Sequence, residues 1–142
     1  MTIPARSPRP LAEIASWHAH VYFRSAEERD IAGWLRDRVA ERFLVRLGRW
    51  HDIAVGPHTR AMYQIAFGCG VFPDLVPWLA LNHRGLSILV HPNTRNPLRD
   101  HVEDGLWLGE KLAVRPERLS SEVAEADGAG EPNTAPLVGV DR

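Results

Sequence analysis

The stretch IASWHAHVYFRSAEERDIAGWLRDRVAERF, residues 14–43, predicts a strand followed directly by a helix. Residues 14–23 are rich in aromatic and β-branched side chains, which favour strands. Ser25 is followed three residues later by Glu28, the capping-box pair that begins a helix. From Ile31 onward apolar side chains recur at helical spacing, which predicts a helix of about four turns.

The remaining sequence continues the alternation of strands and helices. The predicted elements are strands at residues 43–47, 61–67 and 86–90 and a second helix at 72–82. Pro77 is compatible with this helix only if it lies in the first turn. The order strand–helix–strand–strand–helix–strand predicts an α+β domain, a ferredoxin-like βαββαβ sandwich with an antiparallel sheet. Residues 106–113 can add a C-terminal edge strand.

Length and local composition predict one domain with two irregular ends. The chain has 142 residues, which suits a single domain. Residues 1–13 are predicted to be a flexible N-terminal arm, and residues 14–119 the folded domain. Residues 120–142 are rich in Ala, Gly, Pro and acidic side chains and contain no aromatic residue, so we expect a disordered acidic tail.

Charge and cysteine content narrow the class of partner and the location. A formal net charge of −1 argues against nucleic acid or an anionic membrane as the main partner. The single cysteine, Cys69, cannot form an internal disulfide, which fits a reducing compartment. No apolar run has the length of a signal peptide or a membrane span. The sequence therefore predicts a cytoplasmic protein.

The chain has seven histidines, and two of them lie in the first strand. His18 and His20 are two residues apart, so both side chains point from the same face of the strand. The helices of a ferredoxin-like domain cover one face of the sheet, and the pair would project from the other. The two imidazoles can bind one metal ion, or divide the work between metal ligation and proton transfer. Alternatively, both are ordinary polar residues on a half-exposed sheet.

Topology brings two further histidines toward this pair. In the predicted fold the third and fourth strands both neighbour the first. His58 precedes the third strand and His91 terminates the fourth, so both can converge with His18 and His20 on the open face.

Other polar and aromatic residues are weaker candidates for the site. His51 can belong to the site or to a turn with Asp52, and His101 lies in a loop that can form one wall of a cleft. Trp50 is a candidate pocket wall for a planar ring. Glu110 can be a carboxylate ligand or part of an edge-strand ion pair. His83, at a helix end, is expected to be a solvated residue without a role in the site.

Several motifs occur in an order that resembles the DOPA 4,5-dioxygenase family. They are WHAHVYF (17–23), LGRWHDIAVGPH (47–58), MYQIAF (62–67), LVPWLALN (75–82), GLSILVHPNT (85–94), LRDH (98–101) and LWLGE (106–110). The similarity spans about residues 16–113, essentially the whole predicted domain, and the acidic tail lies outside it.

The resemblance implies a ferredoxin-like fold, a homodimer and extradiol cleavage of DOPA or another small catechol by dioxygen. It implies non-haem Fe(II) as the cofactor, and Zn(II) can occupy such a site in purified protein. Fe(II) must keep open positions for catechol and dioxygen, so the protein supplies about three ligands. The alternative is a non-enzymatic metal- or small-ligand-binding dimeric α+β module.

The resemblance also assigns roles to individual residues. His18, His20, His58 and His91 lie at motif positions expected to serve the metal, and His20 and His58 are the candidates for acid/base steps. We expect the substrate to contact Trp50, His51, Arg95 and His101. Arg95, with Arg60 and Arg99, is a candidate partner for a substrate carboxylate, or simply a solvated loop charge.

Overall fold

The elements follow one another in the predicted strand and helix order. The computed structural model describes residues 7–142. The elements are β1 (Ser16–Phe23), α1 (Ala26–Arg42), β2 (Arg46–Leu47), β3 (Ala61–Phe67), α2 (Phe72–Asn82), β4 (Ile88–Asn93), α3 (Pro97–Val102) and β5 (Leu106–Leu108). Short 3-10 turns lie at Leu11–Glu13 and Pro116–Arg118. The predicted α+β class and βαββαβ order are confirmed, with α3 and β5 added after β4.

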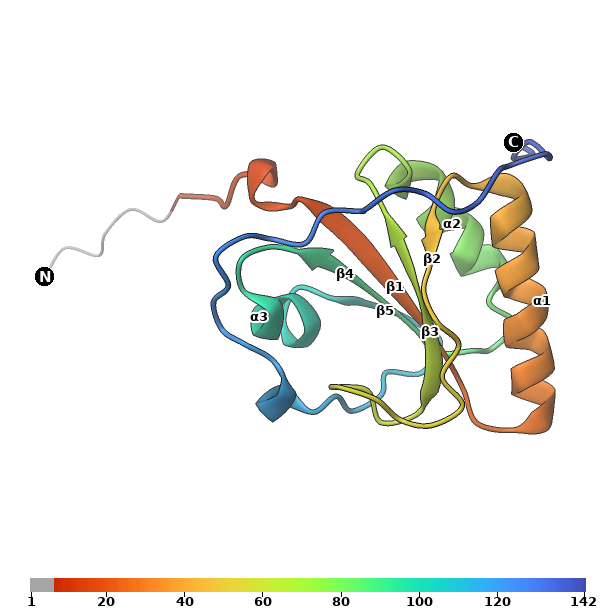
Figure 1. Cartoon of the computed structure of the whole chain (residues 1–142), viewed down its shortest axis with the longest axis horizontal. Helices are drawn as coiled ribbons and strands as arrows, with labels where there is room; N and C mark the ends of the chain where they lie inside the picture. The colour runs from red at the N-terminus through yellow and green to blue at the C-terminus, as the bar shows by residue number, and fades with distance from the viewer. Residues whose placement is uncertain (1–6) are drawn as a thin grey trace, which may run out of the picture.

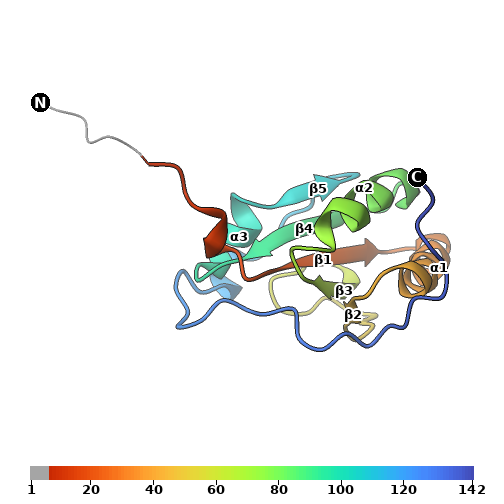
Figure 2. The ribbon, with the colours of Figure 1, turned by 90° about the horizontal axis from the view of Figure 1, so that it is seen from above.

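The five strands form one antiparallel sheet in the order β2-β3-β1-β4-β5. Figure 2 shows the strands in this order, from β5 at one edge to β2 at the other. The first four strands have the ferredoxin-like arrangement, so β1 lies between β3 and β4. Figure 1 shows α1 and α2 on one side of the sheet and α3 on the other.

The main hydrophobic core lies between the sheet and the two longer helices. Ala19 and Val21 of β1 are fully buried and belong to one cluster with Leu35 of α1 and Leu79 of α2. Because side chains alternate along a strand, the residues between them point to the opposite face. That face carries a smaller apolar cluster around Tyr22 and the histidines described below.

The two long helices begin and end close to the predicted residues. The capping prediction is confirmed, since the Glu28 backbone N–H donates to the Ser25 hydroxyl oxygen at 3.1 Å. The prediction that Pro77 must lie in the first turn of α2 is wrong, because Pro77 is inside the helix. The carbonyl that would have bonded to its missing N–H belongs to Pro73, four residues earlier and close to the start of α2.

The two edge strands are shorter than predicted. Only Arg46–Leu47 of residues 43–47 pair as β2, and the edge strand β5 ends at Leu108 rather than at residue 113. Gly109 ends β5 with a φ of +72°, and a Cβ there would lie 2.5 Å from the Leu86 carbonyl oxygen.

The fourth strand runs further along the chain than predicted. It spans Ile88–Asn93, so His91 lies within the strand and does not terminate it. β5 pairs only with residues 88–90. The missing N–H of Pro92 therefore falls where β5 no longer pairs, which lets β4 continue beside β1.

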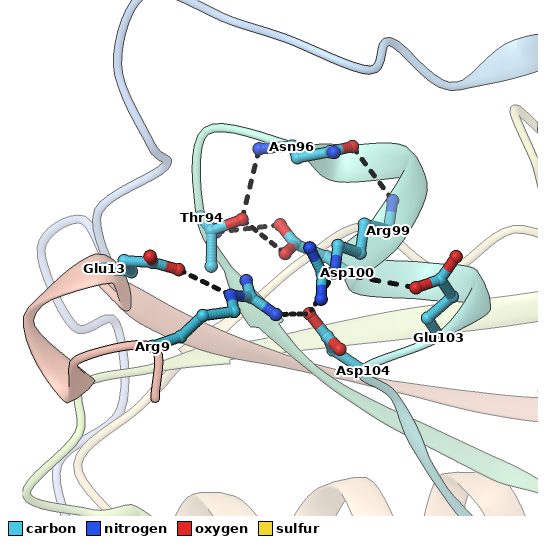
Figure 3. A network of polar contacts seen from close by, with 8 residues as sticks. All are labelled: Arg9, Glu13, Thr94, Asn96, Arg99, Asp100, Glu103 and Asp104. Carbon is cyan, nitrogen blue, oxygen red and sulfur yellow. Dashed lines mark hydrogen bonds and ion pairs between the residues drawn. The ribbon is translucent and has the colours of Figure 1, made fainter. Parts of the chain in front are cut away.

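The described residues before β1 and after β5 contact the domain. Residues 1–6 of the predicted arm lie outside the described residues, and Arg9 forms ion pairs with Glu13 and Asp104 (Figure 3). Residues 120–142 contain no helix or strand, and Figure 1 shows them running along the domain. The division into arm, domain and disordered tail stays a prediction. No helix within residues 7–142 is long and apolar enough to cross a membrane.

Candidate metal centre and active site

Five histidine side chains lie together on the sheet face that points away from α1 and α2. His18 and His20 project from β1, and His91 on β4 lies directly opposite His18. His58 comes from the connection before β3, and its ring centroid is 4.1 Å from that of His20. His101 comes from α3, and its ring centroid is 3.9 Å from that of His91. We call these five residues the histidine cluster.

Three members of the cluster are arranged as ligands for one metal ion. His18, His20 and His91 each offer a ring nitrogen, and these nitrogens all lie within 4.8 Å of one another. The Nε2 atoms of His20 and His91 are 2.9 Å apart. Two nitrogens bound at right angles to one ion at about 2.1 Å are about 3.0 Å apart, so this spacing fits adjacent positions of an octahedral site.

Hydrogen bonds to backbone carbonyls fix the tautomers of two rings. The Nδ1–H of His91 donates to the Pro92 carbonyl at 2.9 Å, and that of His101 donates to the Pro97 carbonyl at 2.7 Å. In a neutral imidazole this leaves the Nε2 lone pair of both rings free to accept a proton or a metal ion. Carbonyl partners of this kind are the usual support of metal-binding histidines.

His20 is the member least satisfied by the protein alone. With the His91 Nε2 unprotonated, the His20 Nε2–H must donate to it, which leaves Nδ1 of His20 without a proton. This Nδ1 is buried and has no hydrogen-bond partner among the described residues. An ion bound between the two Nε2 atoms would take the place of the hydrogen that His20 and His91 share. The donor set therefore fits a metal ion such as Fe(II) or Zn(II).

Burial keeps the imidazoles neutral. Burial, together with the neighbouring imidazoles, lowers the pKa of His18 and of His58 to about 4. Burial also holds the pKa of His20 and of His91 well below the usual range, and it lowers the pKa of His101. At neutral pH the histidine cluster is thus in the form that binds metal ions and accepts protons.

A tyrosine orients His58. The hydroxyl of Tyr22 and the Nδ1 of His58 are 2.7 Å apart, and both groups are buried. Burial raises the pKa of the Tyr22 hydroxyl, so the phenol stays protonated. The ring of Tyr22 stacks on Trp107 at a centroid distance of 5.8 Å. Because the Tyr22 hydroxyl occupies Nδ1 of His58, Nε2 is the nitrogen of His58 that can contact a bound ligand.

A polar network holds α3, which carries His101 (Figure 3). The Asp100 carboxylate is buried and accepts hydrogen bonds from the Thr94 backbone N–H at 2.8 Å and the Thr94 hydroxyl at 2.5 Å. Asn96 caps the helix by accepting from the Arg99 N–H at 3.0 Å. Burial raises the pKa of Asp100, while its bonds from Thr94 oppose that change. The network fixes the first turn of α3 and therefore the backbone that positions His101.

Two hollows border the cluster, one at His58 and one at His101. One, of about 400 Å³, is lined by residues that include His51, Val55, His58 and Met62. The other, of about 220 Å³, is lined by residues that include His101 and Trp107. Flat apolar side chains beside a few polar groups are typical of sites for small aromatic ligands.

Comparison with known proteins gives the family. The sequence profile of the Dopa 4,5-dioxygenase family matches residues 17–118. The chain belongs to this family. It is 38% identical over 111 residues to the DOPA 4,5-dioxygenase of Amanita muscaria, across 72% of this chain and 49% of that protein. It is 33% identical over 106 residues to an uncharacterized 21.2 kDa protein of Botryotinia fuckeliana, across 68% and 58% of the two chains.

A solved structure similar to this Dopa 4,5-dioxygenase family member supports the fold. A crystal structure of a "putative dioxygenase" from Nostoc punctiforme superposes with a TM-score of 0.75 at 49% sequence identity. The match covers 78% of this chain and 95% of the Nostoc chain. By contrast, the chain spans about half the length of the curated relatives that it matches.

Most of the histidines predicted for this family member do come together. The structure brings His18, His20, His58 and His91 into one cluster, as their topology predicts. His101 was expected only as a wall of a cleft, but its ring lies against that of His91. The remaining predicted histidine, His51, lines the same hollow as His58.

Two other residues predicted to contact the substrate lie outside the histidine cluster. Trp50 stacks on Phe23 and Tyr63, with centroid distances of 4.4 and 5.4 Å, on the sheet face that α1 and α2 cover. It is therefore not a wall of the histidine site. Arg95 is exposed and donates to the Val123 carbonyl, and it lines a separate outer hollow of about 620 Å³ together with Arg99.

Glu110, a candidate carboxylate ligand, and His83, expected to have no role in the site, both lie outside the histidine cluster. Glu110 is exposed in the turn after β5, next to Gly109. His83, at the end of α2, is half-buried rather than solvated, and its Nδ1 lies 2.9 Å from the Leu86 carbonyl.

The sequence interpretation missed the aromatic pair beside His58. Trp107 stacks on Tyr22 on the histidine face. The available signal was parity: Tyr22 shares its strand face with His18 and His20, and Trp107 pairs with Leu89, two residues before His91.

Proposed function

We propose that this chain is an extradiol ring-cleaving dioxygenase that acts on DOPA or a related small catechol at a histidine-bound non-haem Fe(II). The observation that carries the proposal is the group of His18, His20 and His91, whose ring nitrogens lie within 4.8 Å of one another on the sheet face that points away from α1 and α2. Three protein ligands leave coordination positions for substrate and dioxygen. A bound Fe(II) would supply the redox chemistry that joins dioxygen to the catechol ring.

The residues around this group support the proposal through proton transfer. His58 is neutral, because burial lowers its pKa to about 4, and Tyr22 holds its Nδ1. With its Nδ1–H donating to the Tyr22 hydroxyl oxygen, the neutral imidazole has a free Nε2 lone pair, which can take the proton of a catechol hydroxyl and return it to the ring-opened product. His20, the other acid/base candidate, is engaged with His91 and suits the role of a ligand better. Trp107 offers a flat surface for the aromatic ring.

The alternative function is a metal- or ligand-binding module without catalysis. A closed site with four protein ligands would favour that function. The candidate ligand group found among residues 7–142 has three histidines, which favours the enzyme. As part of the same proposal we expect a homodimer in the cytoplasm, where a reducing environment suits both Fe(II) and the free Cys69.

Anaerobic reconstitution tests the proposal. The purified chain is loaded with Fe(II) without oxygen, mixed with L-DOPA and then exposed to air, and oxygen uptake and the coloured ring-opened product are followed together. His18→Ala and His91→Ala should abolish both signals, whereas the matched control His83→Ala, in a histidine at the end of α2, should retain them. Bound iron with no oxygen uptake for any catechol would contradict the enzyme and support the binding module.

A further inference from the structure

We infer that residues 120–134, which we call the strap, close one side of the histidine cluster and restrict access to His18. The strap follows the part of the chain that matches the family profile, which ends at residue 118. It was expected to be disordered, yet it has two sets of hydrogen bonds to the domain, one on each side of the point where it crosses the histidine face.

The first anchor lies at the connection between β4 and α3. The Leu98 backbone N–H donates to the Ser120 carbonyl at 2.9 Å. The Val123 N–H donates to the Arg95 carbonyl at 2.8 Å, and the Arg95 guanidinium donates back to the Val123 carbonyl at 3.2 Å. These bonds join the start of the strap to the segment that leads into α3.

The middle of the strap then crosses the end of the histidine face. The hydroxyl of Ser16, which is fully buried, donates to the Asp127 carbonyl at 2.5 Å. Ser16 points from the same face of β1 as His18, and it lies opposite Asn93 of β4. The Asn93 side chain donates to the Ser16 hydroxyl at 2.9 Å. The strap therefore lies directly beyond the pair of His18 and His91.

Asp127 meets the sheet through its backbone carbonyl, which accepts from Ser16, and the residue itself is exposed.

The second anchor caps the edge strand of the sheet. The Asn133 side chain accepts from the Leu47 N–H at 2.8 Å and donates to the Leu47 carbonyl at 3.0 Å. The Thr134 hydroxyl accepts from the Val45 N–H at 2.9 Å and donates to the Phe43 carbonyl at 2.7 Å. These bonds satisfy backbone groups of the β2 edge that would otherwise be open to another strand.

Polar contacts hold the strap to the domain. Its sequence, SSEVAEADGAGEPNT, has Val123 as its one large apolar residue. Segments with few apolar contacts open more easily than a packed core. The strap thus covers the His18 side, while the two hollows beside His58 and Trp107 remain as routes to the cluster.

Chemical modification of the metal-free full chain tests this inference. Diethyl pyrocarbonate reacts with neutral, accessible imidazoles, and mass spectrometry of peptides gives a rate for each histidine. The double variant Asn133→Ala/Thr134→Ala removes the side-chain hydrogen bonds of the second anchor and keeps the length of the chain. We expect His18 to react about tenfold faster in this variant, because several hydrogen bonds no longer hold the strap.

Two controls separate opening of the strap from unfolding. His83, at the end of α2, should react at an unchanged rate in the double variant. Leu137→Ser changes a side chain that is 91% exposed and leaves both anchors intact, so it should leave the His18 rate unchanged. An unchanged His18 rate in the folded double variant would overturn the inference. The test needs neither metal nor catechol, so it stands apart from the proposed function.

Discussion

Acidification of the metal-free protein should destabilise it through the histidine cluster, and His58 allows the effect to be measured. Burial lowers the pKa of His58 to about 4 in the folded chain, against 6.5 for the free side chain. Between these values the unfolded chain binds a proton that the folded chain does not. Stability is therefore full above about pH 6.5 and is lost as the pH falls toward about pH 4.

The pKa difference sets the size of the loss. A shift of one pKa unit corresponds to about 1.4 kcal/mol, so His58 alone lowers the free energy of unfolding by about 2.5 kcal/mol at about pH 4.5. The pKa of His18 has a similar shift, and burial lowers the pKa of His20 and of His91 as well. Against a typical total of about 5–15 kcal/mol, the cluster is sufficient to unfold the metal-free domain in mild acid.

Urea unfolding at about pH 7.5 and about pH 4.5 measures the effect. Wild type and His58→Gln are compared, and the quantity of interest is the difference in stability between the two pH values within each protein. The glutamine keeps a polar side chain beside Tyr22 but does not titrate, so its pH-dependent loss should be smaller by about 2.5 kcal/mol. The matched control is His83→Gln, outside the cluster, which should behave as wild type. Equal losses in wild type and His58→Gln would refute the reasoning.

Three further outcomes follow from single contacts. Asp100→Ala should lower the free energy of unfolding by about 2–3 kcal/mol in urea titrations, because it leaves two buried hydrogen-bond donors unpaired. The control Asp104→Ala breaks a more exposed ion pair and should lower the free energy of unfolding by less than about 1 kcal/mol. Gly109→Ala should cost about 3 kcal/mol by the same measurement, because its φ is +72° and the new Cβ meets a carbonyl oxygen. Zn(II) should raise the Tm of wild type but not of His91→Ala in differential scanning fluorimetry, and EDTA should reverse the rise. An equal rise of Tm in both proteins would contradict ligation by His91.

The sequence by itself determined the order of the elements and the faces of the strands. Ser25 and Glu28 are three residues apart, so the start of α1 depends only on local geometry. The same holds for His18 and His20, because period-two alternation in a strand places them on one face whatever the rest of the chain does. The strand–helix order then made a central β1 the expected result, which is why His58 and His91 could be predicted beside it.

Only the tertiary structure decided which side chains from the connections reach the site. Trp50 and His101 both lie outside the strands, where sequence spacing assigns no face. Packing turned Trp50 onto Phe23 on the helix side, while the Asp100 network placed His101 against His91. Likewise, the path of the strap depends on hydrogen bonds between residues more than 80 positions apart. Local patterns are silent on such contacts, because they arise only once the sheet has brought distant segments together.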